Sequence, residues 1–143
     1  MGGVCGGLHG ARIPTYDLDV VHSRRPENLS RLTAALAELQ AVYRLQHNRQ
    51  LSPPLSALAA PGHNLLTTIC GDFDILGTIG ESLSYEDLLP RTEMMDLGEG
   101  LLVRVLDLPT LIEVKKQAGR PRDLDHVRNL KEVLRERERL GSS

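Results

Sequence analysis

Two aspartates one residue apart, Asp17 and Asp19, head the apolar stretch DLDVV at residues 17–21. The β-branched end of this stretch predicts a short strand, in which residues i and i+2 point to the same face. Two carboxylates held side by side repel each other unless they share a cation, and Mg²⁺ suits hard oxygen ligands. The spacing therefore indicates a metal site, with an ordinary edge strand beside a turn as the alternative.

A third acid should come from a neighbouring strand, because carboxylates from adjacent strands clamp the ions of a two-metal site. The stretch GDFDILG supplies Asp72 and Asp74. Asp74 falls inside a predicted strand, whereas Asp72 falls at a turn, where Asp is common for its own reasons. A further pair, Asp123 and Asp125, falls on a predicted helix, where i and i+2 do not share a face. The candidate metal-binding and catalytic residues are therefore Asp17, Asp19 and Asp74.

The elements that must position these acids are a mixture of strands and helices. Strands are predicted at 17–21, 65–69 and 73–79, and on both sides of Gly98–Gly100. Helices are predicted from about Asn28 to Asn48, over 84–92, over 109–119 and over about 121–140. The residues CGD between the second and third strands favour a hairpin. This mixture, with several antiparallel signals, predicts the α+β class.

The sequence predicts a cap for the helix over 84–92 and an apolar face for the last helix. Ser84 is expected to cap the helix over 84–92, with Asp87 in the position where a capping box usually has Glu. In the last helix, the residues predicted to face inward are Leu124, Val127, Leu130 and Leu134.

The composition is that of an ordinary globular domain. The length of 143 residues predicts one domain over 1–143, and 41% hydrophobic with 25% charged residues excludes a disordered chain. A formal net charge of −2 offers no general attraction to nucleic acid or anionic membrane. Cys5 and Cys70 form no zinc-binding pattern, and neither a membrane span nor a signal peptide is apparent. We therefore expect a cytoplasmic protein with free thiols.

The stretch GGVCGGLHGARIPTYDLDVV resembles the signature of the nucleotidyltransferase superfamily related to DNA polymerase beta. In that superfamily a Gly-Gly or Gly-Ser pair opens a short helix, and an Asp-x-Asp strand follows. More closely, the chain resembles the AbiEii-like nucleotidyltransferases, a family of the abortive-infection toxin type. The stretches GDFDILG, SYEDLL and DLPTLIEVKKQAGRPRDLDHVRNL continue the resemblance in register, so that it covers most of the chain.

This resemblance implies a polymerase-beta-like fold, with a mixed sheet flanked by helices. It implies a Mg²⁺-dependent enzyme, with Mn²⁺ as the alternative ion, that moves a nucleoside monophosphate from an NTP to a hydroxyl of RNA, protein or a small molecule. Asp17 and Asp19 would bind the metal, and Asp74 would bind it and help to deprotonate the attacking hydroxyl. The residues that would bind the nucleotide are Gly2, Gly3, Thr15 and Lys115.

Lys115 precedes the stretch AGRPRD, where the family has a lysine that could neutralise phosphate charge. Arg120 and Asp123 in that stretch match family positions as well. A buried Arg–Asp pair that holds two helices together explains those two residues equally well.

The family usually has a strand before its glycine pair, whereas this sequence begins at Met1. A sheet without that strand keeps an exposed edge, so we expect either a homodimer or a mobile N-terminus. The family also implies an antitoxin partner. The alternatives to an enzyme are a catalytically degraded module of the same fold, binding nucleotide or metal or forming dimers, and a purely structural domain.

Overall fold

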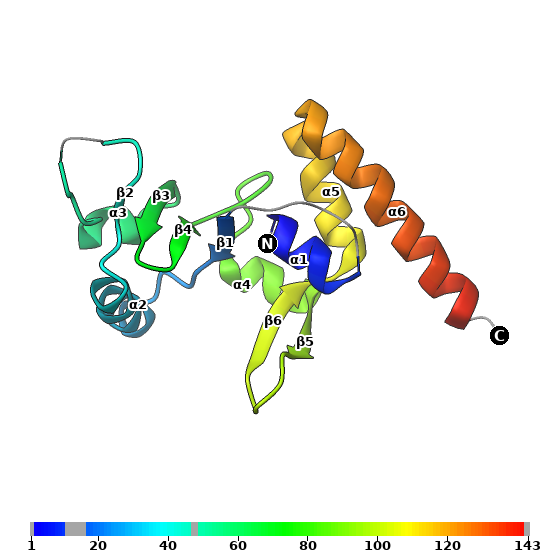
Figure 1. Ribbon diagram of the computed structural model, residues 1–143, viewed down its shortest axis with the longest axis horizontal. Coiled ribbons are helices and arrows are strands. Elements are labelled where there is room, and N and C mark those ends of the chain that lie inside the picture. The colour runs from blue at the N-terminus through cyan, green and yellow to red at the C-terminus, as the bar shows by residue number, and fades with distance from the viewer. Residues whose placement is uncertain (1, 11–16, 47–48, 142–143) are drawn as a thin grey trace. The chain divides into compact units, whose positions relative to one another are not determined.

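The computed structural model describes residues 2–10, 17–46 and 49–141, which group into two compact units. One unit, here called the sheet unit, runs over Tyr16–Asp87; the other, the helical unit, combines Met1–Thr15 with Leu88–Ser143. Figure 1 labels the elements of both in chain order. Helices and strands are mixed along the chain, which confirms the α+β class, whereas the single domain over 1–143 stays a prediction.

The sheet unit is built on a four-stranded mixed sheet. Its strands lie in the order β1 (Asp17–Val21), β4 (Gly71–Leu76), β3 (His63–Thr68) and β2 (Val42–Tyr43). β1 runs parallel to β4, while β3 is antiparallel to both β4 and β2. The predicted hairpin of β3 and β4 is confirmed, and β1 joins the sheet through a connection of about 50 residues.

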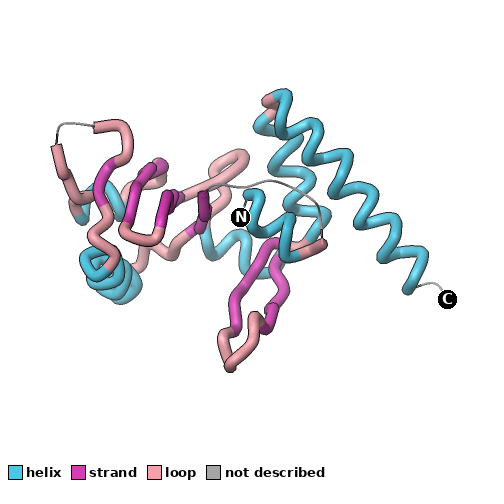
Figure 2. Tube along the Cα trace, in the orientation of Figure 1, coloured by secondary structure: helices cyan, strands magenta, loops and turns pink. Residues whose placement is uncertain are grey.

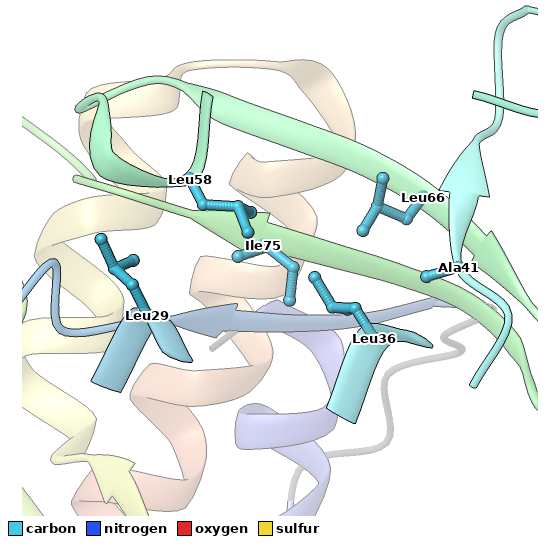
Figure 3. Packing of buried hydrophobic residues seen from close by; sticks show 6 residues of the cluster. All are labelled: Leu29, Leu36, Ala41, Leu58, Leu66 and Ile75. Atoms are coloured by element: carbon cyan, nitrogen blue, oxygen red, sulfur yellow. The ribbon is translucent and has the colours of Figure 1, made fainter. Parts of the chain in front are cut away.

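One face of this sheet carries the apolar core of the unit. Leu66 and Ile75 on the strands meet Leu29 and Leu36 of helix α2 (Pro26–Glu38), as Figure 3 shows. Helix α3 (Leu55–Ala59) adds the buried Leu58. Because strand residues alternate between faces, burying Val20 and Ile75 on this face leaves the acids of β1 and β4 on the other.

The helix predicted from about Asn28 to Asn48 is shorter than expected at its C-terminal end. α2 ends at Glu38, and Gln40 has a left-handed φ of 53° while Ala41 N–H donates to Leu36 O at 3.0 Å. Val42 and Tyr43 then pair with β3 rather than continuing the helix. Val42 and Tyr43 happen to continue the apolar period of the helix. Their pairing with β3, and not this period, decides their conformation.

The strand predicted over 73–79 ends early, at Leu76. Gly77 N–H donates to Gly62 O at 3.0 Å, which turns the chain out of the β4 ladder. The two segments approach so closely that a Cβ on Gly77 would clash with the backbone oxygen of Ala60 and with the backbone of Pro61. This approach requires a residue without a side chain.

The chain then reaches α4 (Tyr85–Leu88) and a 3₁₀ turn (Leu89–Arg91). Ser84 N–H donates to Asp87 Oδ2 at 2.9 Å, and Asp87 N–H donates back to Ser84 Oγ at 3.2 Å. The predicted capping box, with Asp in the place of Glu, is therefore confirmed.

The helical unit contains one hairpin and three helices within the residues described. Figure 2 distinguishes the hairpin strands from the helices. The elements are α1 (Gly2–Leu8), β5 (Thr92–Asp96), β6 (Leu102–Leu106), α5 (Leu108–Ala118) and α6 (Pro121–Gly141). None of the helices in the described part of the chain is long and apolar enough to cross a membrane.

Helices α5 and α6 pack against each other as an antiparallel pair. Asp107 caps α5 by accepting Thr110 N–H at 2.8 Å, and Gly119 ends it with a left-handed φ of 67°. On α6 the buried row is Asp123, Val127 and Leu130. The prediction that Leu124 faces inward is wrong, because this side chain is 49% exposed: the row begins one residue earlier, at a polar position.

Gly77→Ala is expected to lower the free energy of unfolding by about 2–4 kcal/mol, because the added methyl group clashes with backbone atoms that cannot rotate away. Gly62→Ala is the matched control, since no atom lies within 4 Å of a Cβ added there. Its change should stay within about 0.5 kcal/mol. Urea unfolding of both variants measures the difference, and equal stability of the two would contradict the close approach.

Candidate metal centre

Three carboxylates converge on the face of the sheet opposite the apolar core. Asp19 pairs in register with Asp74 across the parallel strands β1 and β4, and Asp17 pairs with Asp72. One oxygen from each of Asp17, Asp19 and Asp74 lies within 4.8 Å of the others. The predicted convergence of these three aspartates is confirmed, while their binding of a metal stays a prediction.

Asp19 has the pKa that this crowding should produce. Burial, followed by the charges of Asp17 and Asp74, raises its pKa from the ordinary 3.8 to about 6. Ionising Asp19 is therefore more costly in the folded chain than in the unfolded chain. A bound divalent cation would reverse this effect by supplying the positive charge that the three carboxylates lack.

A fourth residue, Arg44, neutralises part of this charge. Its Nη2 lies 3.0 Å from Asp74 Oδ1, and its Nη1 lies 3.3 Å from Asp72 Oδ2. Burial alone would lower the pKa of Arg44, but the hydrogen bond and charge of Asp74, with the charge of Asp72, raise it. Arg44 is thus a partly buried counter-ion for Asp72 and Asp74 on this face of the sheet.

Sequence reasoning did not find Arg44. The residue follows β2 directly, and the sequence pattern predicted a helix there. Its backbone N–H donates to Leu65 O at 3.0 Å, so the pairing of β2 with β3 is what brings the guanidinium to β4. No local signal in the sequence indicates this contact.

The donor set of the cluster fits a hard divalent cation. All of the candidate ligands are carboxylate oxygens, which Mg²⁺ and Mn²⁺ prefer. Asp74 is only 5% exposed, and its Oδ1 accepts no hydrogen bond of normal geometry from the described residues, although it contacts Arg44.

The residues predicted to bind nucleotide lie elsewhere in the chain. Gly2 and Gly3 begin α1, which confirms that the glycine pair opens a short helix, and Lys115 lies on α5. All three belong to the helical unit, whereas the aspartates belong to the sheet unit. Thr15 lies outside the described residues. The nucleotide-binding roles of these four residues stay predictions.

Lys115 belongs to a network of charges between α5 and α6. Its Nζ lies 3.8 Å from Asp123 Oδ1 and 3.2 Å from His126 Nδ1, and Arg120 Nε donates to Asp123 Oδ2 at 2.7 Å. The predicted Arg120–Asp123 pair is therefore confirmed, and Lys115 extends it across both helices. Both Lys115 and Asp123 are almost fully buried, so each needs the other's charge.

The titration of this network follows from the same contacts. Burial acts to raise the pKa of Asp123, but the hydrogen bond and charge of Arg120 and the charge of Lys115 outweigh it and hold the pKa below its ordinary value. Burial and the charge of Lys115 lower the pKa of His126. A neutral His126 can then accept a hydrogen bond from the Lys115 ammonium group.

In the absence of divalent cations, Asp19→Asn is expected to raise the free energy of unfolding at pH 7.5 by about 1 kcal/mol. The substitution removes one of three clustered charges, and solvent screening keeps the gain below what a fully buried group would give. Because its pKa is raised on folding, protonated Asp19 adds to the free energy of unfolding. This addition is fully present below pH 3.8 and is lost as the pH rises through about 6. The gain of the variant should therefore vanish near pH 4.

Urea unfolding with EDTA present, at pH 7.5 and at pH 4, measures this gain. Asp96→Asn, an exposed aspartate of the hairpin, controls for the loss of one charge. A destabilised Asp19→Asn chain at pH 7.5 would show that the cluster is not under electrostatic repulsion.

Asp123→Asn is expected to destabilise the chain by about 2–4 kcal/mol at pH 7, because it leaves the Lys115 ammonium group buried without its negative partner. The depressed pKa of Asp123 has a second consequence, since the stability it provides is present above its unfolded pKa and is lost on acidification through the folded pKa. Asp125→Asn is the control, on the same helix with a side chain that is 73% exposed. Thermal unfolding should separate the two variants clearly, and equal melting temperatures would contradict the network.

Among the described residues, Asp17, Asp19 and Asp74 form the one group of three side chains that could hold a metal ion. The sequence matches no protein-family model and no curated protein.

Proposed function

We propose that this chain is a metal-dependent nucleotidyltransferase of the polymerase-beta-like fold. The observation that carries the proposal is the meeting of Asp17, Asp19 and Asp74 oxygens within 4.8 Å on two adjacent parallel strands. Carboxylates at this spacing suit a two-metal centre, in which the ions lie about 3.5–4 Å apart. Such a centre binds the triphosphate of an NTP as well as the protein.

The electrostatics of the site support the same function. The pKa of Asp19 is raised first by burial and then by the negative charges of Asp17 and Asp74. Strongly perturbed carboxylates collected on one surface are a common property of sites that bind cations or perform catalysis. The described part of the helical unit also has an acid with a shifted pKa, Asp123, but its shift is downward and has partners in Arg120 and Lys115.

The reaction requires the chain to position the acceptor hydroxyl, the NTP and the metal ions. The acceptor hydroxyl oxygen attacks the α-phosphorus of the NTP, the bond between that phosphorus and the bridging oxygen breaks, and pyrophosphate leaves. Asp74 accepts the proton of the hydroxyl, while Asp17 and Asp19 hold the metal ions. Bound Mg²⁺ would supply positive charge next to the phosphate oxygens. Pyrophosphate and the nucleotidylated acceptor are the products.

Further support comes from the agreement of several separate stretches with the AbiEii-like pattern described above. On that basis the substrate is an NTP, and the acceptor is RNA, protein or a small molecule. That pattern also assigns nucleotide binding to Gly2, Gly3, Thr15 and Lys115, although Lys115 is buried and contacts Asp123 and His126. Each of these assignments extends the proposal beyond the three aspartates.

NTP binding provides the first test. Thermal and urea unfolding of the chain with Mg²⁺ and each of the four NTPs should show a gain of about 2.7 kcal/mol at a ligand concentration 100 times its Kd. Asp17→Asn/Asp19→Asn should lose this ligand-dependent gain because the metal ligands are gone. Asp96→Asn/Asp125→Asn changes the net charge equally and should retain it. No gain with any NTP, with either Mg²⁺ or Mn²⁺, would overturn the proposal.

Transfer is tested with NTPs labelled at the α- or the γ-phosphate, incubated with total RNA and with cell protein. A nucleotidyltransferase leaves the α-label on the acceptor and releases the γ-label as pyrophosphate. Transfer of the γ-label would instead indicate a kinase. Stabilisation by NTP without any transfer would favour the alternative of a nucleotide-binding module.

A further inference from the structure

Arg44 occupies the same carboxylate that the proposed metal would need. Its Nη2 lies 3.0 Å from Asp74 Oδ1 and 3.3 Å from Asp74 Oδ2, so a single nitrogen faces both oxygens. Asp74 is the most buried of the three candidate ligands. The side chain of Arg44 is 25% exposed and that of Asp74 is 7% exposed, so water screens their attraction only partly.

Nη1, the second terminal nitrogen of the guanidinium, has contacts that do not involve Asp74. Nη1 donates to the backbone oxygen of Leu66 at 3.2 Å and lies 3.3 Å from Asp72 Oδ2. The backbone of Arg44 is fixed as well, by its N–H bond to Leu65 O. These contacts keep the guanidinium at the acidic face even when Nη2 leaves Asp74, so its release requires a small rotation and no unfolding of β2.

Resting on the proposed metal-dependent function, we propose that Arg44 is a positioning residue that acts as a built-in counter-ion for Asp74. It holds this carboxylate when no metal is bound, and a divalent cation that binds the same oxygens competes with Nη2 for their lone pairs. Arg44 thereby sets the metal concentration at which the site fills. It is a positioning residue, since it acts through Asp74 and not on the substrate.

The physical basis is a competition of two cations for one anion. A guanidinium has hydrogen-bond donors only and cannot share a carboxylate lone pair with a metal ion. Its positive charge also repels a doubly charged ion that approaches the same group. Even at the dielectric constant of water, this repulsion at a separation of about 6 Å corresponds to about tenfold in binding.

Removing Arg44 should therefore have two opposite effects. The metal-free chain loses the cation that separates Asp72 and Asp74 and becomes less stable. Metal binding becomes tighter, because the competitor is gone and because the metal now relieves more repulsion. A residue that only braces β2 would produce the first effect without the second.

The experiment measures Mn²⁺ binding to the whole chain without nucleotide, by calorimetry and by the electron paramagnetic resonance signal of free Mn²⁺. Arg44→Gln is expected to tighten the Kd for Mn²⁺ by about tenfold. Arg44→Lys keeps the positive charge and should stay within about threefold of the starting chain. Arg31→Gln is the matched control: this exposed arginine lies on α2, which covers the opposite face of the sheet, and its loss should leave the Kd unchanged.

Unfolding measurements cover the case in which Arg44→Gln is unstable. A variant that folds only when Mn²⁺ is added, with a larger metal-induced gain than the starting chain, supports the inference. A variant that stays unfolded at saturating Mn²⁺, or one that binds Mn²⁺ with the same or a weaker affinity, overturns it.

The outcomes also separate this inference from the proposed function. The metal site and the role of Arg44 both fail if the starting chain binds no Mn²⁺. They also fail if Asp17→Asn/Asp19→Asn binds Mn²⁺ as tightly as the starting chain. If the metal binds but Arg44→Gln leaves the affinity unchanged, only the role of Arg44 fails. Tighter binding by Arg44→Gln in a chain that transfers no nucleotide supports the counter-ion and refutes the transferase.

Discussion

The parallel pairing of β1 with β4 is the interaction on which the rest of the sheet unit depends. In this register Asp19 lies beside Asp74, while Val20 lies beside Ile75 on the opposite face. The same hydrogen-bonded ladder therefore builds the apolar core under α2 and the acidic surface above it. A slip of one residue in β1 would turn its aspartates toward the core and its valine toward water. The core and the candidate site are consequently specified together.

This coupling has an electrostatic cost. Burying apolar residues on one face forces four carboxylates onto the other, since both strands alternate with the same phase. The fold offsets part of the repulsion with Arg44, which arrives from a separate strand at the other edge of the sheet. Burial, and then the remaining repulsion from Asp17 and Asp74, raise the pKa of Asp19. A cation bound at this surface would remove a cost that folding has already imposed.

The charges between α5 and α6 illustrate the opposite arrangement. Asp123 is as deeply buried as Asp74, yet its carboxylate receives Arg120 and Lys115, and its pKa is lowered and not raised. Its buried charge is matched by opposite charge, as expected of a group that joins two helices. Two aspartates, Asp19 and Asp123, thus differ in the direction of their pKa shift because of their partners and not because of burial alone.

Features that depend on neighbours along the chain can be predicted from the amino-acid sequence. The period of a strand places Asp17 and Asp19 on one face, and capping residues such as Ser84 and Gly119 mark helix ends, because these effects act within a few residues. Contacts between distant segments set the ending of α2 at Glu38, the inward row of α6 that begins at Asp123, and the approach of Arg44 to Asp74. Each of these depends on which distant segments pair and pack, and the energy of such contacts overrides local preference. The third acid is an intermediate case: its residue type and strand were readable in the sequence, but the register that brings Asp74 beside Asp19 arises from the pairing of two strands about 50 residues apart.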